Sequence, residues 1–77
     1  MSKQIASIDA IKKAIDIVGG NTQLSLKANI SYQSIIDWKS GRKSPTPLNC
    51  IKIEKATDGK VNRREILPEF PWDELNQ

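Results

Sequence analysis

The fold is decided by the stretch TQLSLKANISYQSIIDWKSGRKS, residues 22–44, in which a short polar turn separates two helical patterns. Asn29 belongs to the residue types that enter the left-handed turn conformation without being glycine. Ser31 follows two positions later and is a good N-cap for a new helix. The stretch therefore predicts two short helices, residues 21–28 and 32–40, joined by a tight turn.

The helix expected over residues 32–40 has two different faces. Ile35 and Trp38 lie three residues apart and form an apolar stripe suited to packing. The polar side chains expected to project from the other side are Tyr32, Gln33 and Asp37. A helix enters the DNA major groove with its N-terminal end, where glutamine can bind adenine through two hydrogen bonds. One face is thus expected to pack and the other to read bases; the alternative is an ordinary solvated surface.

Helical patterns continue on both sides of this stretch. Apolar spacing predicts a helix over residues 8–18, which a Gly-Gly pair ends. The pair Thr46-Pro47 is typical of a helix start, and Gly59 of the following stop. Residues 62–65, Asn-Arg-Arg-Glu, have the pattern of a capping box for a short last helix. The chain is therefore expected to be all-α, with five helices.

Length and composition limit the classes of protein that need to be considered. Seventy-seven residues suffice for one compact domain, and 38% apolar with 27% charged residues is ordinary for a soluble protein. No apolar run approaches the roughly 20 residues that span a bilayer, and the first ten residues lack a signal-peptide pattern. We expect a soluble, cytoplasmic protein with no membrane contact.

Enzymatic and metal-dependent functions are disfavoured by the residue types that are missing. The chain has one cysteine, Cys50, and no histidine, which removes the usual zinc ligand sets and histidine-activated nucleophiles. Cys50 lies on the apolar stripe of its helix and is expected to be a small core residue rather than a reactive thiol. We therefore expect no enzyme and no cofactor.

Charge is distributed unevenly along the chain. Residues 1–64 hold all twelve Lys and Arg against five acids, a net charge of +7, whereas residues 65–77 hold four acids and no base, a net charge of −4. This division favours a polyanion-binding body with an acidic end, although a chance imbalance of solvated charges is the alternative.

The segment NTQLSLKANISYQSIIDWKSGR, residues 21–42, resembles the helix-turn-helix of the Cro and CI repressors of temperate phages. The wider pattern, over roughly residues 9–70, is similar to the small Cro-like YdaS family. The resemblance implies a compact lambda-repressor-like domain, residues 1–67, followed by a short extended tail, residues 68–77. Three residues depart from the family pattern: Leu26, where a polar residue is usual, Ala28, where a larger apolar one is usual, and Asn29, where glycine is usual.

The resemblance also implies which side chains contact DNA. Base contacts would come from Tyr32, Gln33, Ser34 and Asp37. Backbone contacts would come from Asn21, Thr22, Lys39, Arg42, Lys43 and Ser44. Such a protein would be a phage or prophage repressor that binds a two-fold operator in double-stranded DNA as a homodimer. It would act on the nucleoid of a bacterial host without a small-molecule effector.

The C-terminal tail carries large apolar side chains among acids. Pro68 and Pro71 prevent the last helix from continuing. Because exposed aromatic residues often anchor interfaces, Phe70, Trp72 and Leu75 are expected to contact a second subunit. The alternative is that the two rings fold back onto the core of their own chain.

Several other side chains and functions allow two interpretations. Ile36 either packs against a neighbour, which we expect, or touches a thymine methyl group. Arg63 and Arg64 either solvate the start of the last helix or add phosphate contacts. The alternative function is an antitoxin-like, protein-binding partner with autoregulatory DNA binding. RNA binding is disfavoured, because the sequence offers no exposed aromatic pair for base stacking.

Overall fold

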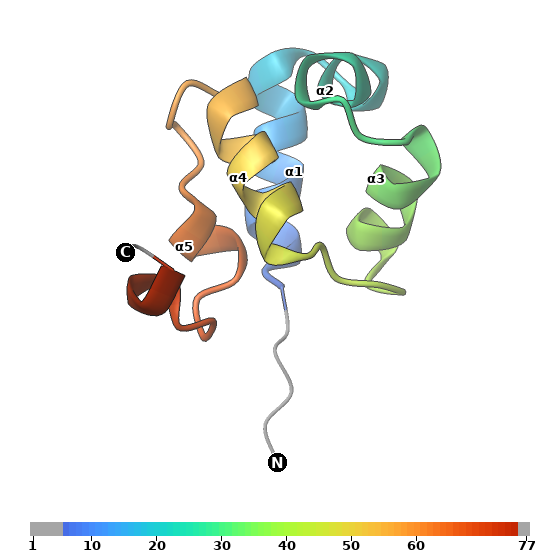
Figure 1. The fold of residues 1–77 in the computed structure, drawn as a ribbon. Coiled ribbons are helices and arrows are strands. Elements are labelled where there is room, and N and C mark those ends of the chain that lie inside the picture. Colours follow the sequence, from blue (N-terminus) through green and yellow to red (C-terminus); the bar gives the residue numbers. More distant parts are fainter. Residues whose placement is uncertain (1–5, 76–77) are drawn as a thin grey trace.

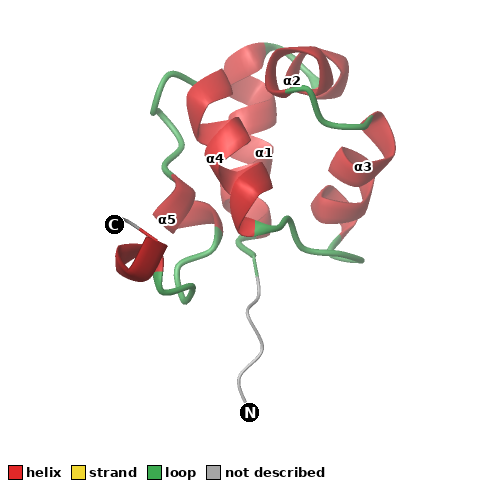
Figure 2. Ribbon diagram, viewed as in Figure 1, coloured by secondary structure: helices red, strands yellow, loops and turns green. Residues whose placement is uncertain are grey.

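The computed structural model describes residues 6–75 as a small bundle of helices (Figures 1 and 2). In this range the elements are α1 Ile8–Val18, α2 Asn21–Ala28, α3 Tyr32–Ser40, α4 Pro47–Ala56, α5 Arg63–Ile66 and a 3-10 helix, η1, Trp72–Leu75. The predicted all-α class with five α-helices is confirmed for the described residues, and none of them forms a strand. None of their helices has the length and apolar character required to cross a membrane.

Most helix ends lie where local chemistry predicts them. The side chain of Ser7 accepts a hydrogen bond from the Ala10 amide and caps α1, and Thr46 caps α4 in the same way through Asn49. Gly19 ends α1 with φ +99°, in the left-handed region. Each of these ends is fixed by one side chain or one glycine, which is why the sequence pattern locates it.

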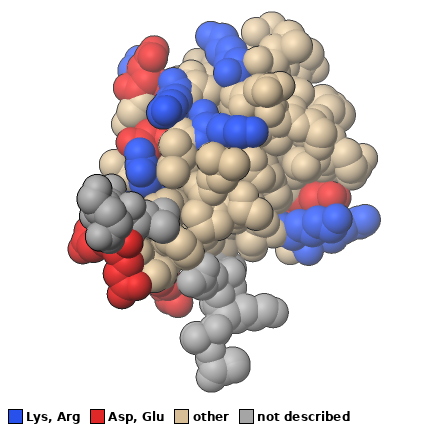
Figure 3. Space-filling view, viewed as in Figure 1, with Lys and Arg blue, Asp and Glu red and all other residues tan. Residues whose placement is uncertain are grey.

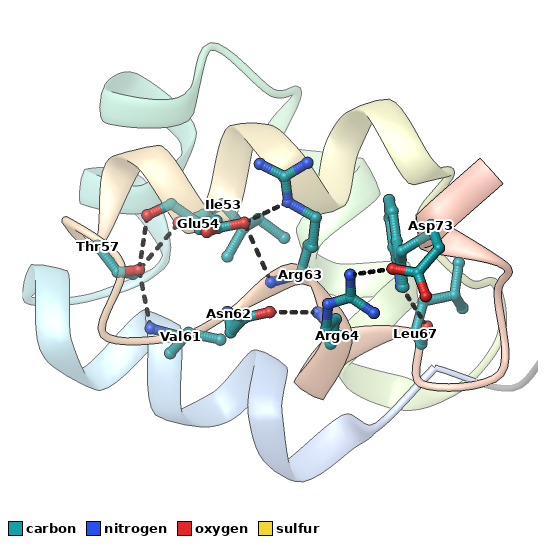
Figure 4. Close-up of polar contacts among 10 residues, drawn as sticks. Ile53, Glu54, Thr57, Val61, Asn62, Arg63, Arg64, Leu67 and Asp73 are labelled. Carbon is teal, nitrogen blue, oxygen red and sulfur yellow. Dashed lines mark hydrogen bonds and ion pairs between the residues drawn. The ribbon is translucent and has the colours of Figure 1, made fainter. Parts of the chain in front are cut away.

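The end of α4 differs from the prediction, because α4 stops at Ala56, before Gly59. Thr57 follows and is buried; its hydroxyl donates to the Ile53 carbonyl and accepts from the Val61 amide, both at 3.1 Å (Figure 4). Thr57 thus satisfies the end of α4 and holds the first residues of the link to α5.

The turn between α2 and α3 has the predicted geometry. Asn29 adopts φ 57° and ψ 53°, in the left-handed region, and Ser31 caps α3 by accepting from the Ser34 amide at 3.1 Å. The hydroxyl of Ser25 also donates to the Ile30 carbonyl at 2.6 Å, which ties α2 to the turn.

One hydrophobic core joins all five helices. Its fully buried members include Ile11, Leu24, Ile35, Cys50, Ile53, Val61 and Ile66. Helix α1 packs against α2, α3 and α5, so it runs through the centre of the bundle (Figure 1). Burial raises the pKa of the Cys50 thiol to about 12, in keeping with the predicted core role. By contrast Leu48, near the start of α4, is exposed.

The tail returns to the body of its own chain. Trp72 is only 3% exposed, and its indole Nε1 donates to the Leu67 carbonyl at 2.8 Å. The half-buried Phe70 meets it edge-on, with ring centroids 4.7 Å apart. The expectation that both rings stand free for a second subunit is therefore wrong for Trp72, because the tail is long enough to bury it locally. The side chain of Leu75 lies outside the described residues, as do residues 1–5 and 76–77.

Two arginines hold this end of the chain through ion pairs (Figure 4). The Arg63 side chain pairs with Glu54 of α4, with Nε 2.6 Å from Oε1, and its guanidinium lies 5.9 Å from the Trp72 ring centroid. Arg64 pairs with the exposed Asp73 at 2.8 Å. Both cations thus have acidic partners within the chain, which the composition of the segment did not reveal.

Candidate nucleic-acid interface

Helices α2 and α3 form a helix-turn-helix, and the second helix is held in place by packing of its apolar side against the core. Ile35 and Trp38 are buried in the core, and α3 packs on both α1 and α2. The opposite side of α3 therefore keeps one orientation relative to the bundle (Figure 1).

The start of α3 presents three polar side chains. Tyr32 and Gln33 are exposed, and Ser34 is partly buried beside the N-cap, where its Oγ accepts from Ser31 Oγ at 2.8 Å. Because the first two turns of a recognition helix approach base edges, these positions suit base contacts, as the sequence suggested.

Asp37 does not project from α3 as expected. It is only 6% exposed, and its Oδ1 accepts a hydrogen bond from Gln33 Nε2 at 3.1 Å. The four-residue spacing places the two side chains on the same side of the helix, one turn apart, so they bond to each other. The expectation of a solvent-facing Asp37 is wrong, and the residue that approaches solvent is its partner, Gln33.

The loop after α3 gathers cations around the same carboxylate. Arg42 Nε lies 4.0 Å from Asp37 Oδ1, and Lys43 Nζ lies 3.9 Å from Oδ2. The backbone amides of both residues also donate to the Asp37 carbonyl, at 2.9 and 3.2 Å. Both cationic side chains remain exposed, and so are Lys39 of α3 and Ser44 of the loop.

The start of α2 has no side-chain cap. Its N-cap is Gly20, so no side chain caps the first amides of this helix, and the N-terminal end of a helix favours negative charge. Thr22 is exposed, while Asn21 is half-buried. The Oδ1 atom of Asn21 is buried and has no hydrogen-bond partner within residues 6–75.

The face of the molecule shown in Figure 3 carries several separate charged groups. Figure 3 shows acidic side chains around the C-terminal segment at the lower left, and basic ones above them. A second basic group, with acidic atoms directly above it, stands at the lower right, where Figure 1 places the α3–α4 loop. The cations of the candidate interface are therefore distant from the acidic end of the chain in this view.

Two features of the interface were missed by sequence analysis. One is the bond between Gln33 and Asp37, which their i, i+4 spacing could have indicated. The other is a groove of about 340 Å³ between α1 and α3, lined by Lys12, Ile36, Lys39 and Ser40. Ile36 is half-buried beside it, so its expected burial is only partial.

Two known proteins are similar to this chain in sequence. A protein of Escherichia coli (strain K12) with the provisional name transcriptional regulator YdaS is 29% identical over 68 residues, which cover 88% of this chain and 69% of that protein. The regulatory protein cro of Pseudomonas phage D3 is 23% identical over 65 residues, which cover 84% of this chain and 89% of that protein. No solved structure matches the chain.

The family comparison covers the helix-turn-helix and the elements that support it. The model of the family described as bacterial toxin YdaS matches residues 11–75, from α1 to the end of η1. This confirms the resemblance drawn from the sequence pattern, and the chain belongs to the YdaS family.

Proposed function

We propose that this protein is a sequence-specific, double-stranded DNA-binding transcriptional repressor of the Cro type. The observation that carries the proposal is the arrangement around α3, which the core holds in one orientation. Exposed polar side chains lie at its start, and exposed cations follow its end. The names of both relatives, which describe regulatory proteins, support the same function. In this role the protein acts on DNA in the bacterial cytoplasm.

The proposed docking places the start of α3 in the major groove. Tyr32, Gln33 and Ser34 then approach base edges, with Gln33 as the main reader. The residues assigned to the DNA backbone are Asn21, Thr22, Lys39, Arg42, Lys43 and Ser44. The uncapped start of α2 supports a phosphate at that end, because its amides carry partial positive charge.

Repression would follow from occupancy of a two-fold operator by two copies of the chain. A dimer places its two recognition helices about 34 Å apart, on successive faces of the major groove. Because Trp72 is buried in its own chain, the dimer contact in this proposal excludes that ring. The half-buried Phe70 is retained as a candidate contact.

A second candidate function is binding to a partner protein, with DNA binding as an autoregulatory activity. Two exposed leucines favour it, since Leu26 is 71% and Leu48 62% exposed, and such side chains suit protein contacts. The toxin description of the family model also fits a function that involves another protein. In an antitoxin-like role, this chain would bind a partner protein and would also regulate its own gene by binding DNA.

Selection of bound sites from random duplex DNA tests the first proposal. We expect a two-fold motif with half-sites about 10 base pairs apart, and a motif altered at one position per half-site for Gln33→Ala. If the parent chain selects no motif although it is folded, sequence-specific repression is excluded. A chain that selects no motif but binds a purified partner protein would favour the second candidate.

A further inference from the structure

Asp37 lies at the junction of the two kinds of contact proposed for α3. On one side it holds the amide of Gln33, the proposed base reader, at 3.1 Å. On the other side it lies 4.0 Å from Arg42 Nε and 3.9 Å from Lys43 Nζ, the proposed phosphate contacts. The Asp37 side chain is itself buried and is poorly placed to reach a base edge.

The chemistry of this contact fixes the orientation of the Gln33 amide. A carboxylate accepts hydrogen bonds and donates none, so the NH₂ group of Gln33 must face Asp37. The reversed amide would bring its oxygen against the carboxylate, with no proton between them. Gln33 is therefore left with one N–H and its Oε1 to offer to DNA.

The two purines present different edges to such an amide. In the major groove adenine offers an acceptor, N7, beside a donor, the N6 amino group, whereas guanine offers two acceptors, N7 and O6. One N–H together with Oε1 matches adenine. Guanine would require both hydrogens of the Gln33 NH₂ group, one of which is bound to Asp37.

We propose that Asp37 is a specificity-determining positioning residue, which makes Gln33 select adenine and reject guanine. The inference rests on the proposed function, in which Gln33 contacts a base. It assigns to Asp37 a role through Gln33 in place of the direct base contact that the sequence resemblance implied. Arg42 and Lys43 offset the charge of the carboxylate close to DNA, and their exposed side chains stay free to contact phosphate.

The test uses the site that the full chain selects from random duplex DNA. Gln33→Ala identifies the base pair that Gln33 reads. Binding of the parent is then measured to this duplex and to one in which that pair is changed from A·T to G·C. We expect the change to weaken binding by the parent about tenfold or more, in line with the worth of one bidentate contact. For Asp37→Ala we expect the two duplexes to differ by about threefold or less.

Two further variants control for folding and for charge. Asp37→Ala should fold, because the side chains that it leaves are exposed and can bond to water. Asp37→Asn keeps the size of the side chain but can accept or donate, so it permits both amide orientations and should give an intermediate discrimination. Asp58→Asn, an equal change of charge at an exposed site after α4, should discriminate like the parent.

The results separate this inference from the proposed function. If Gln33→Ala alters no position of the selected site, the docking itself is wrong. If Gln33→Ala does locate a base pair, the inference about Asp37 is overturned by either of two results: that pair is not A·T, or Asp37→Ala and Asp37→Asn, folded like the parent, still reject G·C as the parent does.

Discussion

Arg63 donates twice to one oxygen of Glu54, through its backbone amide at 3.2 Å and through its Nε at 2.6 Å. The side-chain bond from Arg63 is the main cause that lowers the pKa of Glu54 below its ordinary value of 4.5. Because α4 and α5 are joined through this carboxylate, its protonation state is linked to the stability of the fold.

The first prediction follows from the sign of that linkage. A carboxyl group whose pKa is lower in the folded chain stabilises the fold above its unfolded pKa, and this contribution is lost as pH falls through the folded value. Replacing Glu54 by Gln should therefore lower the free energy of unfolding by about 1 kcal/mol at pH 7. The difference from the parent should shrink as the pH falls below 4.5.

Urea unfolding at several pH values, followed by circular dichroism, measures this difference. Glu69→Gln is the matched control, because Glu69 is exposed and its replacement should change stability little. A gap between parent and Glu54→Gln that stays constant from pH 7 to pH 3 would show that the ion pair contributes nothing.

The second prediction concerns the tail. Trp72 is buried and bonded to Leu67, so Trp72→Ala should lower the free energy of unfolding by roughly 3–5 kcal/mol, much of the stability of so small a domain. Trp72→Phe should cost less, because a ring still fills the site. Deletion of residues 69–77 should likewise lower the melting temperature.

Sedimentation and thermal melting together distinguish this outcome from a tail that serves the dimer. A truncated chain with the melting temperature of the parent but a larger dimer dissociation constant would restore the tail to the subunit interface.

The third prediction is that Gln33→Ala weakens binding to the selected site by roughly 1–3 kcal/mol, the worth of one bidentate base contact. Binding to unrelated duplex DNA should hardly change, because Gln33 carries no charge. Fluorescence anisotropy with both duplexes measures the two affinities. Equal losses on both would mean that Gln33 does not read sequence.

The fourth prediction concerns Arg42 and Lys43, whose exposed cations should contact phosphate. Replacing both by Ala should weaken binding to all duplexes alike and reduce the slope of log K against log salt by about 1 per lost contact in each subunit. Lys55→Ala with Lys60→Ala removes the same charge from exposed positions in the last turn of α4 and in the segment after it, and serves as the control. Equal slopes for the two double variants would exclude the loop from the interface.

The fifth prediction concerns Asn29, which holds φ 57° in the turn before α3. Alanine tolerates this conformation less well, so Asn29→Ala should lower the free energy of unfolding by about 1 kcal/mol. Asn29→Gly should leave it equal or higher, since glycine adopts positive φ without steric cost. Thermal melting of the three chains checks the order, and an alanine variant as stable as the glycine one would contradict it.

The sequence predicted features that depend on one residue and its near neighbours. Asn29 and Ser31 mark the turn and the start of α3 because each acts on its own local backbone. The buried pair behind α3, Ile35 and Trp38, was also predictable, since helical spacing alone places both on one side.

Features that depend on distant parts of the chain were not predictable in this way. Burial of Trp72 requires the Leu67 carbonyl and the Arg63 side chain to lie around it, which only the packed structure provides. Leu48 is likewise exposed because no other part of the described chain covers it at the start of α4, and the local sequence pattern does not indicate this. Sequence patterns indicate whether a helix face is apolar or polar, whereas the element that packs against an apolar face depends on the whole fold.

The polar contacts of α3 have a consequence for how the binding preference of such a domain can change. Among residues 6–75, every side-chain hydrogen bond and ion pair of residues 31–43 has both ends within that segment. Its attachment to the body is through apolar side chains such as Ile35 and Trp38. The segment is therefore exchangeable as one unit. Under the proposed function, a related sequence grafted here with the apolar positions kept would bring its own cap, base readers and phosphate contacts, and would change operator preference without redesign of the core.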